Sequence, residues 1–272
     1  MQQDKFREAS ISRFKAVLDS DGGIRAWQNR YTFKHHPPEA SLPPYTIANQ
    51  DIAHLIPETH IPWGNWRSVD HSKHGFFVES FVDELAHAAG KDPVAFRMDL
   101  LKENPRMQKV LAMAAEKANW GSPLEEGKGR GVSIVESFGS IVAEVAEVSI
   151  NEEGKVAVDK VVCVADAGYV VHPDAFIAQM ESGIIFGLTA ALYGEINIEN
   201  GAVKESNFHD YQMLRMNEAP KIDTYIINSR EAMGGAGEPS TPGIAPAVCN
   251  AIFAATGTRI RELPIRKVVE VF

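Results

Sequence analysis

Residues 141–168 read IVAEVAEVSINEEGKVAVDKVVCVADAG, and this stretch decides the fold class. Two apolar runs flank the polar turn at 152–154, and such runs joined by a short turn that contains glycine predict a β-hairpin. An apolar helix is expected over 175–195, opened by Pro173, because proline is favoured at the first helical position. Hairpins that alternate with packed helices predict an α+β fold with mixed or antiparallel sheets, and not a doubly wound parallel sheet.

The same alternation continues on both sides of this hairpin. Residues 35–66 hold six prolines and predict irregular structure that is either functional or wrapped over a neighbour. The glycine-rich stretch 121–131 is the best internal boundary, and it divides the chain into regions 1–126 and 127–272. Two further hairpins are predicted, over 11–33 with a turn at 19–23 and over 196–208 with a turn at Asn200-Gly201. Helices are predicted over 74–90, from Asp92-Pro93 onward, over 107–120 and over 244–257. A strand is predicted over 222–229.

The helix predicted over 74–90 is amphipathic. Phe77, Phe81 and Leu85 recur at a spacing of four residues, which places them on one face of a helix. We expect this face to be buried and the acidic residues Glu79, Asp83 and Glu84 to form the exposed face.

Composition excludes some classes of function. The chain has 272 residues, with 27 Lys and Arg against 36 Asp and Glu, and its formal net charge is −9. Nucleic-acid binding needs clustered basic side chains, so no nucleic-acid partner is expected. No run approaches the ~18 apolar residues of a membrane span, and the charged start does not resemble a signal peptide. The expected compartment is the cytoplasm, or the periplasm if a partner carries the signal.

The cysteine content is low. Cys163 and Cys249 are the two cysteines, and a reduced compartment is the simplest assumption, although a disulfide between them stays open. An iron–sulfur cluster usually takes four thiolates. Any such cluster is therefore expected on another chain.

The stretch best suited to chemistry is MGGAGEPSTPG, residues 233–243. Thr241 is expected as the N-cap of the following helix and Pro242 as its first residue, so the loop would deliver Glu238 close to a helix N-terminus. Glycines let a backbone approach a ligand closely, and the amides and dipole at a helix N-terminus favour an anion. Glu238 could then act as a general base. The alternative is a plain turn in which Glu238 is solvated or caps the helix.

Other polar residues give weaker signals. Arg67 follows two tryptophans and would either hold a phosphate or carboxylate or stack on an exposed tryptophan. His71 and His74 would share a helix face, but no third ligand stands at a recognisable spacing, and no metal site is predicted. The segment 137–140 lacks the pattern of a serine nucleophile. The remaining histidines, at 35, 36, 54 and 60, are interpreted as loop residues.

Five stretches, in one order along nearly the whole chain, resemble a known family. The family is the molybdopterin-binding large subunit of the xanthine oxidase and aldehyde oxidase type, and within it the β-subunit of isoquinoline 1-oxidoreductase, in its C-terminal portion. The stretches are WRSVDHSKHGFFVESFVDELAHAAGKDPVAFRMDLL (66–101), ESFGSIVAEVAEVSI (136–150), DAGYVVHPDAFIAQMESGIIFGLTAALYGE (166–195), SNFHDYQMLRMNEAP (206–220) and GGAGEPSTPGIAPAVCNAIFAATGTRIRELPI (234–265).

The resemblance implies a chemistry and a site. The family oxidises an aldehyde or N-heterocycle with water as the oxygen source, on a molybdopterin-type molybdenum cofactor that in some members has the cytosine dinucleotide form. Its Gly-x-Gly-Glu glutamate, the active-site base, matches Glu238, and its Trp-Arg arginine near the substrate matches Arg67. The implied cofactor-binding residues are Phe138, Gly139, Gly235, Ala236 and Gly237.

The chain also departs from the family pattern. Family members are more than twice as long, and their Gly-Gln-Gly and Phe-Gly-Gly motifs have no counterpart here. We therefore expect the isolated chain to lack the cofactor and activity, and to need an upstream portion of the large subunit and a [2Fe-2S] small subunit as partners. The alternative is a non-catalytic remnant or interaction module that forms a homo-oligomer through surfaces that would face the absent domain. A nucleotide-binding enzyme fits worst, because the glycine loop has neither Gly-x-Gly-x-x-Gly spacing nor a Walker lysine.

Overall fold

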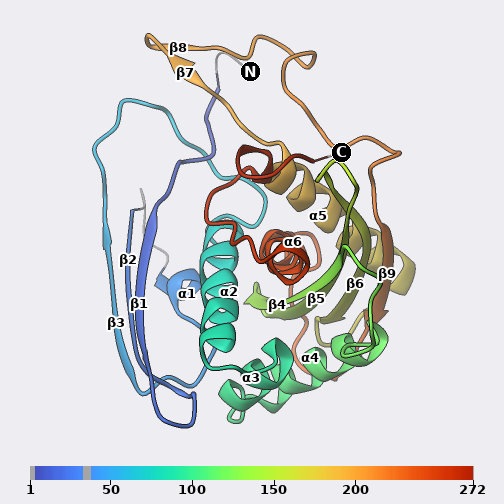
Figure 1. The fold of residues 1–272 in the computed structure, drawn as a ribbon. Coiled ribbons are helices and arrows are strands. Elements are labelled where there is room, and N and C mark those ends of the chain that lie inside the picture. Colours follow the sequence, from blue (N-terminus) through green and yellow to red (C-terminus); the bar gives the residue numbers. More distant parts are fainter. Residues whose placement is uncertain (1–3, 33–37, 272) are drawn as a thin grey trace.

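The structure, a computed structural model, describes residues 4–32 and 38–271 and has the predicted α+β architecture (Figure 1). A four-stranded sheet has the order β4-β5-β6-β9, in which β6 and β9 are parallel and the other neighbours are antiparallel. The sheets are therefore mixed, as predicted. The strands are β4 (Lys128–Ser137), β5 (Ser140–Ile150), β6 (Val156–Asp166) and β9 (Lys221–Ile226).

The hairpin predicted from residues 141–168 is confirmed as β5 and β6. Its turn lies at 151–155, where Gly154 has a φ of 82°. The sheet has packed layers on both faces, which explains why β5 is buried over most of its length and reads as a nearly continuous apolar run. The short hairpin of β7 (Ile198–Glu199) and β8 (Ala202–Val203), with Asn200 and Gly201 at its turn, is also confirmed.

Strand β4 was not predicted, because its glycines suggest a linker. In the structure these glycines allow close packing on the last helix, α6 (Thr241–Thr256). A Cβ atom on Gly131 would lie 2.2 Å from the carbonyl oxygen of Ala247, so no larger residue fits there. The division of the chain into regions 1–126 and 127–272 stays a prediction.

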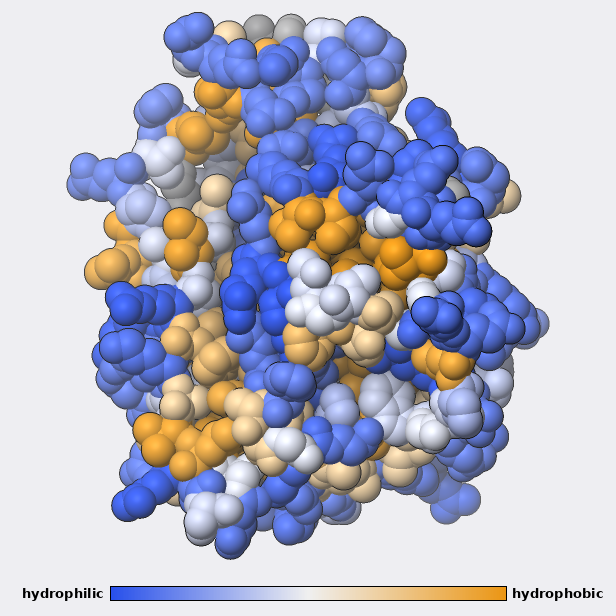
Figure 2. Space-filling view, in the orientation of Figure 1, coloured by the Kyte–Doolittle hydropathy of each residue, from blue (hydrophilic) through white to orange (hydrophobic). Residues whose placement is uncertain are grey.

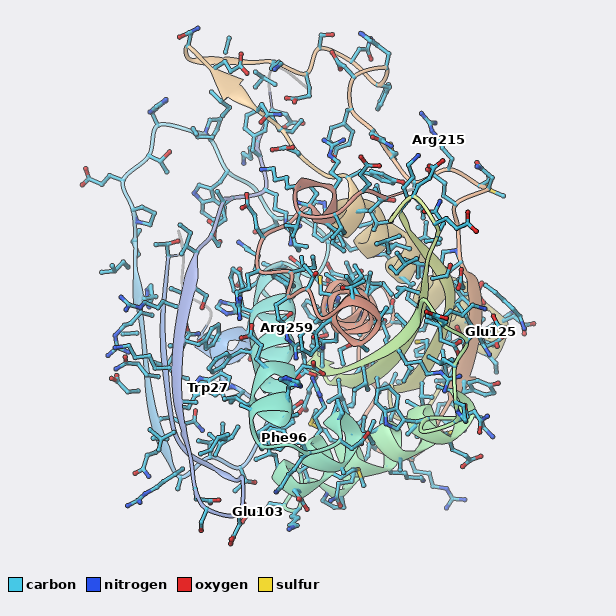
Figure 3. The ribbon with its side chains drawn as sticks, viewed as in Figure 1. Trp27, Phe96, Glu103, Glu125, Arg215 and Arg259 are labelled. Atoms are coloured by element: carbon cyan, nitrogen blue, oxygen red, sulfur yellow. The ribbon has the colours of Figure 1, made fainter. Side chains whose placement is uncertain are left out.

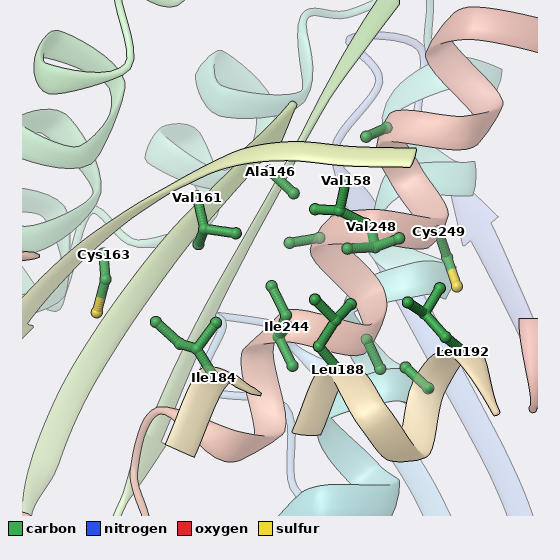
Figure 4. Close-up of a cluster of buried hydrophobic side chains, with 14 of the residues drawn as sticks. Ala146, Val158, Val161, Cys163, Ile184, Leu188, Leu192, Ile244, Val248 and Cys249 are labelled. Carbon is green, nitrogen blue, oxygen red and sulfur yellow. The ribbon is translucent and has the colours of Figure 1, made fainter. Parts of the chain in front are cut away.

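Helices α5 (Pro173–Leu192) and α6, both predicted as helices, cover one face of the four-stranded sheet. Figure 4 shows Ile184 and Leu188 of α5 meeting Ile244 and Val248 of α6 in a buried cluster with sheet residues such as Val161. Burial of these aliphatic side chains is the main force that holds the helices on the sheet.

Helix α5 is long and apolar enough to cross a membrane by the criteria of length and composition. Its residues Phe176, Met180 and Ile184 are buried in the core. A core helix of a folded domain has the same apolar character, so the apolar stretch is explained by packing.

The opposite face of the sheet packs against α4 (Pro105–Lys117), which follows α2 (His71–Ala88) and α3 (Pro93–Leu100). All three helices were predicted. The N-cap of α3 is Asp92, whose side chain accepts hydrogen bonds from the amides of Val94 and Ala95 at 2.9 Å. This cap is the one expected from the Asp-Pro pair.

A second sheet, of order β1-β2-β3, covers the outer side of α2 (Figure 1). The hairpin predicted over 11–33 is confirmed as β1 (Ser12–Leu18) and β2 (Ile24–Thr32), and Trp27 points from it towards α2 (Figure 3). The prediction that 35–66 is irregular was wrong in part: it contains α1 (Pro38–Ser41) and β3 (Asn49–Leu55). Strand β3 is polar and largely exposed, so no apolar alternation marks it. Phe33, His35 and His36 lie outside the described residues.

The prediction that Glu79, Asp83 and Glu84 form an exposed face was wrong for the first two. The side chains of Glu79 and Asp83 are 1% and 6% exposed, because α2 lies between the outer sheet and α6. Arg97 donates to Glu79 at 2.9 Å, and Arg259 donates to Asp83 at 2.6 Å. Arg97 lies in α3 and Arg259 follows α6, and Figure 3 shows Arg259 beside α2 and α6. Acidic side chains can be buried in this way when each is paired with a basic group.

Candidate functional site

The glycine loop at 234–237 is docked on the tip of the β4–β5 hairpin. The amide of Gly235 donates to the carbonyl of Phe138 at 2.8 Å, and the hydroxyl of Ser140 donates to the carbonyl of Gly235 at 2.6 Å. A Cβ atom on Gly234 would lie 2.3 Å from the hydroxyl oxygen of Ser140. The first two glycines are therefore required for close packing of loop on hairpin.

Phe138 and Gly139 form the two-residue turn of that hairpin. Their φ angles are 53° and 75°, and two successive positive values are typical of the tight turn that suits the twist of paired strands. A phenylalanine in this region of backbone space is uncommon and marks local strain. Its ring is 40% exposed and lies 5.3 Å from the ring of His71. The structure thus brings together the predicted residues Phe138, Gly139 and Gly235.

An ion pair between Arg106 and Asp166 lies next to this hairpin tip. Arg106 binds both carboxylate oxygens of Asp166 at 3.0 and 3.1 Å and also approaches the carbonyl of Gly139 at 3.4 Å. Burial acts to raise the pKa of Asp166, but hydrogen bonds from Arg106, Ser229 and the amide of Gly168 outweigh it and hold that pKa below its usual value. Asp166 therefore stays ionised and ties β6 to the site.

The second wall of the site is the segment that precedes α2. Ser68 and Val69 have φ angles of 68° and 46°, which are rare for residues other than glycine, and backbone strain of this kind clusters at functional sites. The strained backbone points the amide of the fully buried Ser68 at Oε1 of Glu238, at 2.9 Å. The hydroxyl of Ser68 donates to the carbonyl oxygen of Glu238. Sequence reasoning missed Ser68, because no pattern of side chains signals a left-handed serine.

Arg67 contacts the residue that precedes the candidate base. Its Nε donates to the carbonyl of Gly237 at 2.7 Å, and its Nη1 donates to the hydroxyl of Ser182 at 3.0 Å. Partial burial lowers the pKa of Arg67, and the nearby carboxylate of Glu238 opposes this effect. The structure therefore brings the predicted residues Arg67, Gly237 and Glu238 into direct contact or near proximity.

Glu238 lies just before α6 and is half-buried, so it is neither fully solvated nor enclosed. Its carbonyl accepts the amide of Thr241 at 3.0 Å. The N-cap of α6 is Ser240 and not Thr241 as predicted, and the hydroxyl of Ser240 donates instead to the carbonyl of Met180 on α5. The prediction that the loop delivers Glu238 to a helix N-terminus is confirmed.

His71 is a second titratable group at the site. Burial lowers its pKa, whereas the carboxylates of Glu39 and Glu238 act to raise it. His74 is packed against the ring of Tyr31 at 4.6 Å, and burial lowers its pKa to about 3. Among residues 4–32 and 38–271, no three His, Cys, Asp or Glu side chains form a group that could hold a metal ion.

The backbone amides of the glycine loop could donate hydrogen bonds to an anionic ligand, such as a pterin that carries a phosphate. The amides of Gly234 and Gly235 are already bonded to the carbonyls of Ala167 and Phe138. The amides of Ala236 and Gly237 have no acceptor within the described part of the chain, and a Cβ atom on Gly237 would meet only open space. The cofactor-binding prediction therefore fits best at Ala236 and Gly237, whereas the amide and carbonyl of Gly235 are used within the protein.

Comparison with known proteins places these observations in a family. The family model for the molybdopterin cofactor-binding domain matches residues 76–220, which end before the glycine loop. The chain is 35% identical to the β-subunit of isoquinoline 1-oxidoreductase from Brevundimonas diminuta, over 82% of this chain and 29% of that protein. It is 33% identical to a subunit of nicotinate dehydrogenase from Pseudomonas putida, over 83% of this chain and 20% of that protein. The chain thus spans less than a third of either relative.

Solved structures show the same fold. The crystal structure of quinoline 2-oxidoreductase from Pseudomonas putida 86 superposes with a TM-score of 0.82 at 12% identity, over 95% of this chain and 61% of that chain. The chain therefore belongs to the molybdopterin cofactor-binding domain family and shares the fold of the xanthine oxidase-type molybdenum enzymes.

Proposed function

We propose that this chain supplies the base-bearing part of a molybdenum hydroxylase that oxidises an N-heterocycle or an aldehyde. The observation that carries this proposal is the fixed position of Glu238 beside the amides of Ala236 and Gly237, which have no acceptor among residues 4–32 and 38–271. When bound, the molybdenum cofactor would supply the redox chemistry and the oxygen derived from water. The names of the relatives, an isoquinoline oxidoreductase and a nicotinate dehydrogenase, support an N-heterocyclic substrate.

Glu238 would act through its second carboxylate oxygen. Oε1 accepts the amide of Ser68, whereas Oε2 has no hydrogen-bond partner among residues 4–32 and 38–271. The bond from Ser68 fixes the plane of the carboxylate and leaves Oε2 as the atom that takes a proton. A general base must be held within hydrogen-bond reach of the proton that it removes.

The neighbouring residues would hold the cofactor and orient the substrate. Ala236 and Gly237 would donate their amides to the cofactor, with Phe138 and Gly139 beside them. The form of the cofactor would be a molybdopterin or its cytosine dinucleotide. The remainder of a large subunit and a [2Fe-2S] subunit in the cytoplasm would complete the enzyme, and the chain without them would be inactive.

The test is the variant Glu238→Gln in the chain co-expressed with the remainder of a large subunit. We expect turnover to fall by at least 100-fold with an unchanged molybdenum content per protein, because the amide keeps the shape but cannot accept the proton. The matched control is Glu205→Gln. Glu205 also accepts a backbone amide, that of Asn197 at 2.7 Å, and the substitution should leave turnover intact. Unchanged turnover in Glu238→Gln would rule out the base.

A second candidate function is a self-associating module without catalysis, and exposed apolar side chains beside the glycine loop favour it. Tyr169, Val171 and Met233 are 56%, 75% and 68% exposed, and Gly168 packs directly on the carbonyl of Ala232. The face seen in Figure 2 carries further hydrophobic patches within a hydrophilic surface. This reading predicts a metal-free dimer that Val171→Asp dissociates in sedimentation velocity, and a strictly monomeric wild-type chain would contradict it.

A further inference from the structure

The side chain of Arg67 lies against a patch on the surface of α5 that consists of Gln179, Ser182 and Phe186, and this patch is called the seat of Arg67. Gln179, Ser182 and Phe186 share one face of that helix, because their spacings of three and four residues correspond to about one turn each. The Nη1 of Arg67 donates to Ser182 at 3.0 Å, and Nη2 donates to the side-chain oxygen of Gln179 at 3.3 Å. The guanidinium carbon lies 5.5 Å from the ring centre of Phe186.

Aromatic stacking adds to this seat. Trp66 stacks on Phe186 with ring centres 4.8 Å apart, and the guanidinium of Arg7 covers Trp66 at 4.2 Å. Arg7 is fixed in turn by a hydrogen bond to the hydroxyl of Ser72 at 3.0 Å. The N-terminal segment therefore holds Trp66, and Trp66 in turn packs on the Phe186 ring that lies beside Arg67.

The seated guanidinium holds the backbone next to the candidate base. Nε and Nη2 of Arg67 both donate to the carbonyl oxygen of Gly237. The next residue, Ser68, binds the next carbonyl oxygen, that of Glu238. Two successive residues thus hold two successive carbonyls. This is significant because Gly237 is exposed, has no side chain to restrain its conformation, and makes no other hydrogen bond within the part of the chain that the structure describes.

We infer that Arg67 and its seat on α5 form a positioning clamp for the glycine loop, and that the guanidinium is not a substrate ligand. Of its five N–H donors, Nε and Nη2 point at Gly237 and Gln179, and Nη1 donates to Ser182. Either edge of the guanidinium that could hold a substrate carboxylate with two parallel N–H groups is therefore already engaged by the protein, and a two-pronged substrate contact would break one of these bonds. The clamp rests on the proposed function, because the loop that it fixes carries Glu238. Arg67, Ser182 and Phe186 are positioning residues that act through the Gly237 carbonyl.

The experiment measures amide hydrogen exchange of the full chain without cofactor, so that its outcome does not depend on catalysis. The reporters are the amides of Gly235 and Thr241, which donate to the carbonyls of Phe138 and Glu238. We expect both to exchange at least ten-fold faster in Arg67→Gln, with amides of the β5–β6 hairpin unchanged. Arg67→Lys should not restore the wild-type rate, because an ammonium cannot reproduce the two-pronged contact.

Phe186→Leu provides a second variant that keeps every charge. Phe186 is 42% exposed, so the substitution removes the stacking surface with little effect on the core, and exchange at Gly235 and Thr241 should again accelerate. The matched control is Arg261→Gln. Arg261 makes a two-pronged contact with Glu84 at 2.7 and 3.0 Å on the surface, and its loss should leave both reporters unchanged.

Turnover in the completed enzyme then separates the two roles of Arg67. A clamp predicts that Arg67→Gln and Phe186→Leu both lower kcat with nearly constant KM. A substrate ligand predicts that Arg67→Gln raises KM, that Phe186→Leu has no effect, and that exchange at the two reporters stays at the wild-type rate. The second set of results would overturn the inference, whereas failure of Glu238 as a base would leave the exchange result standing.

Discussion

The backbone amide of Ser68 lies 2.9 Å from Oε1 of Glu238, although 170 positions separate the two residues in the sequence. This contact joins the segment before α2 to the loop before α6. It depends on a serine in the left-handed region, since φ at Ser68 is 68°. The fold therefore accepts local strain where it orients the candidate base.

Substitutions at Ser68 should separate its backbone strain from its hydroxyl bond. Ser68→Ala loses the bond to the carbonyl of Glu238, which contributes about 1 kcal/mol. Ser68→Gly loses the same bond but relieves the left-handed backbone by about 1 kcal/mol. In urea unfolding we expect the glycine variant to be close to wild type and about 1 kcal/mol more stable than the alanine variant. Equal stabilities of the two variants would show that the backbone is not strained.

Local sequence patterns predicted most helices and hairpins, but they did not predict the contacts that hold Glu238 in place. The pair Asp92-Pro93 caps the helix that follows it, and the pair Asn200-Gly201 forms the turn between two adjacent strands. Both effects are local, so they can be predicted from the sequence alone. The contacts of Ser68 with Glu238 depend on residues far apart in sequence, and no local pattern encodes them. Glu238 and its loop were predicted from the glycines and from family resemblance, whereas the seat of Arg67 on α5 arises from contacts between segments far apart in the chain.

The buried acids of α2 make the same point. Glu79 and Asp83 sit at positions that an amphipathic helix would expose, and their burial depends on Arg97 and Arg259, which lie outside α2. The sequence analysis missed strand β3 for a different reason. It is an exposed edge strand that follows prolines, and its polar composition carries no apolar period.

Removing Arg97 should be strongly destabilising. Its Nε donates to Glu79 at 2.9 Å, and both side chains are almost fully buried. Arg97→Met leaves the Glu79 carboxylate without its charged partner, and breaking a buried pair in this way typically costs about 3–5 kcal/mol. The control is Asp51→Asn, which breaks the exposed pair with Arg30 and should change stability little, because solvent screens an exposed ion pair. Similar losses for both variants, measured by urea unfolding, would contradict this account.

Glu144 should make the stability of the protein depend on pH. It is fully buried in the apolar layer between β5 and α6, and burial raises its pKa well above the ordinary 4.5. Cys163 faces it from β6, Ser133 and Gly243 adjoin it from β4 and α6, and the carboxylate of Glu181 on α5 acts on the same region. The folded state therefore favours the protonated acid.

The sign of this effect follows from the raised pKa. The unfolded chain releases the proton near pH 4.5, whereas the folded chain keeps it, so the stability that is fully present below that pH declines as pH rises towards the folded pKa. Glu144→Gln, neutral at every pH, should flatten this decline and be more stable than wild type at pH 8. Glu147→Gln, on the same strand and paired with Arg130, serves as the control and should keep the decline. Parallel curves for wild type and Glu144→Gln in unfolding between pH 5 and 8 would refute the assignment.

The contact between β4 and α6 sets the position of the helix whose N-terminus follows Glu238, and Gly131 is its tightest point. A Cβ atom there would lie 2.2 Å from the carbonyl of Ala247 and 2.2 Å from the amide of Ala251, both rigid backbone. Gly131→Ala should therefore push α6 away from the sheet and destabilise the chain by at least about 2 kcal/mol. Gly154→Ala adds a methyl group in open space at a φ of 82° and should cost only about 1 kcal/mol of backbone strain. Because α6 moves in the first variant alone, exchange of the Thr241 amide should accelerate there and not in the second.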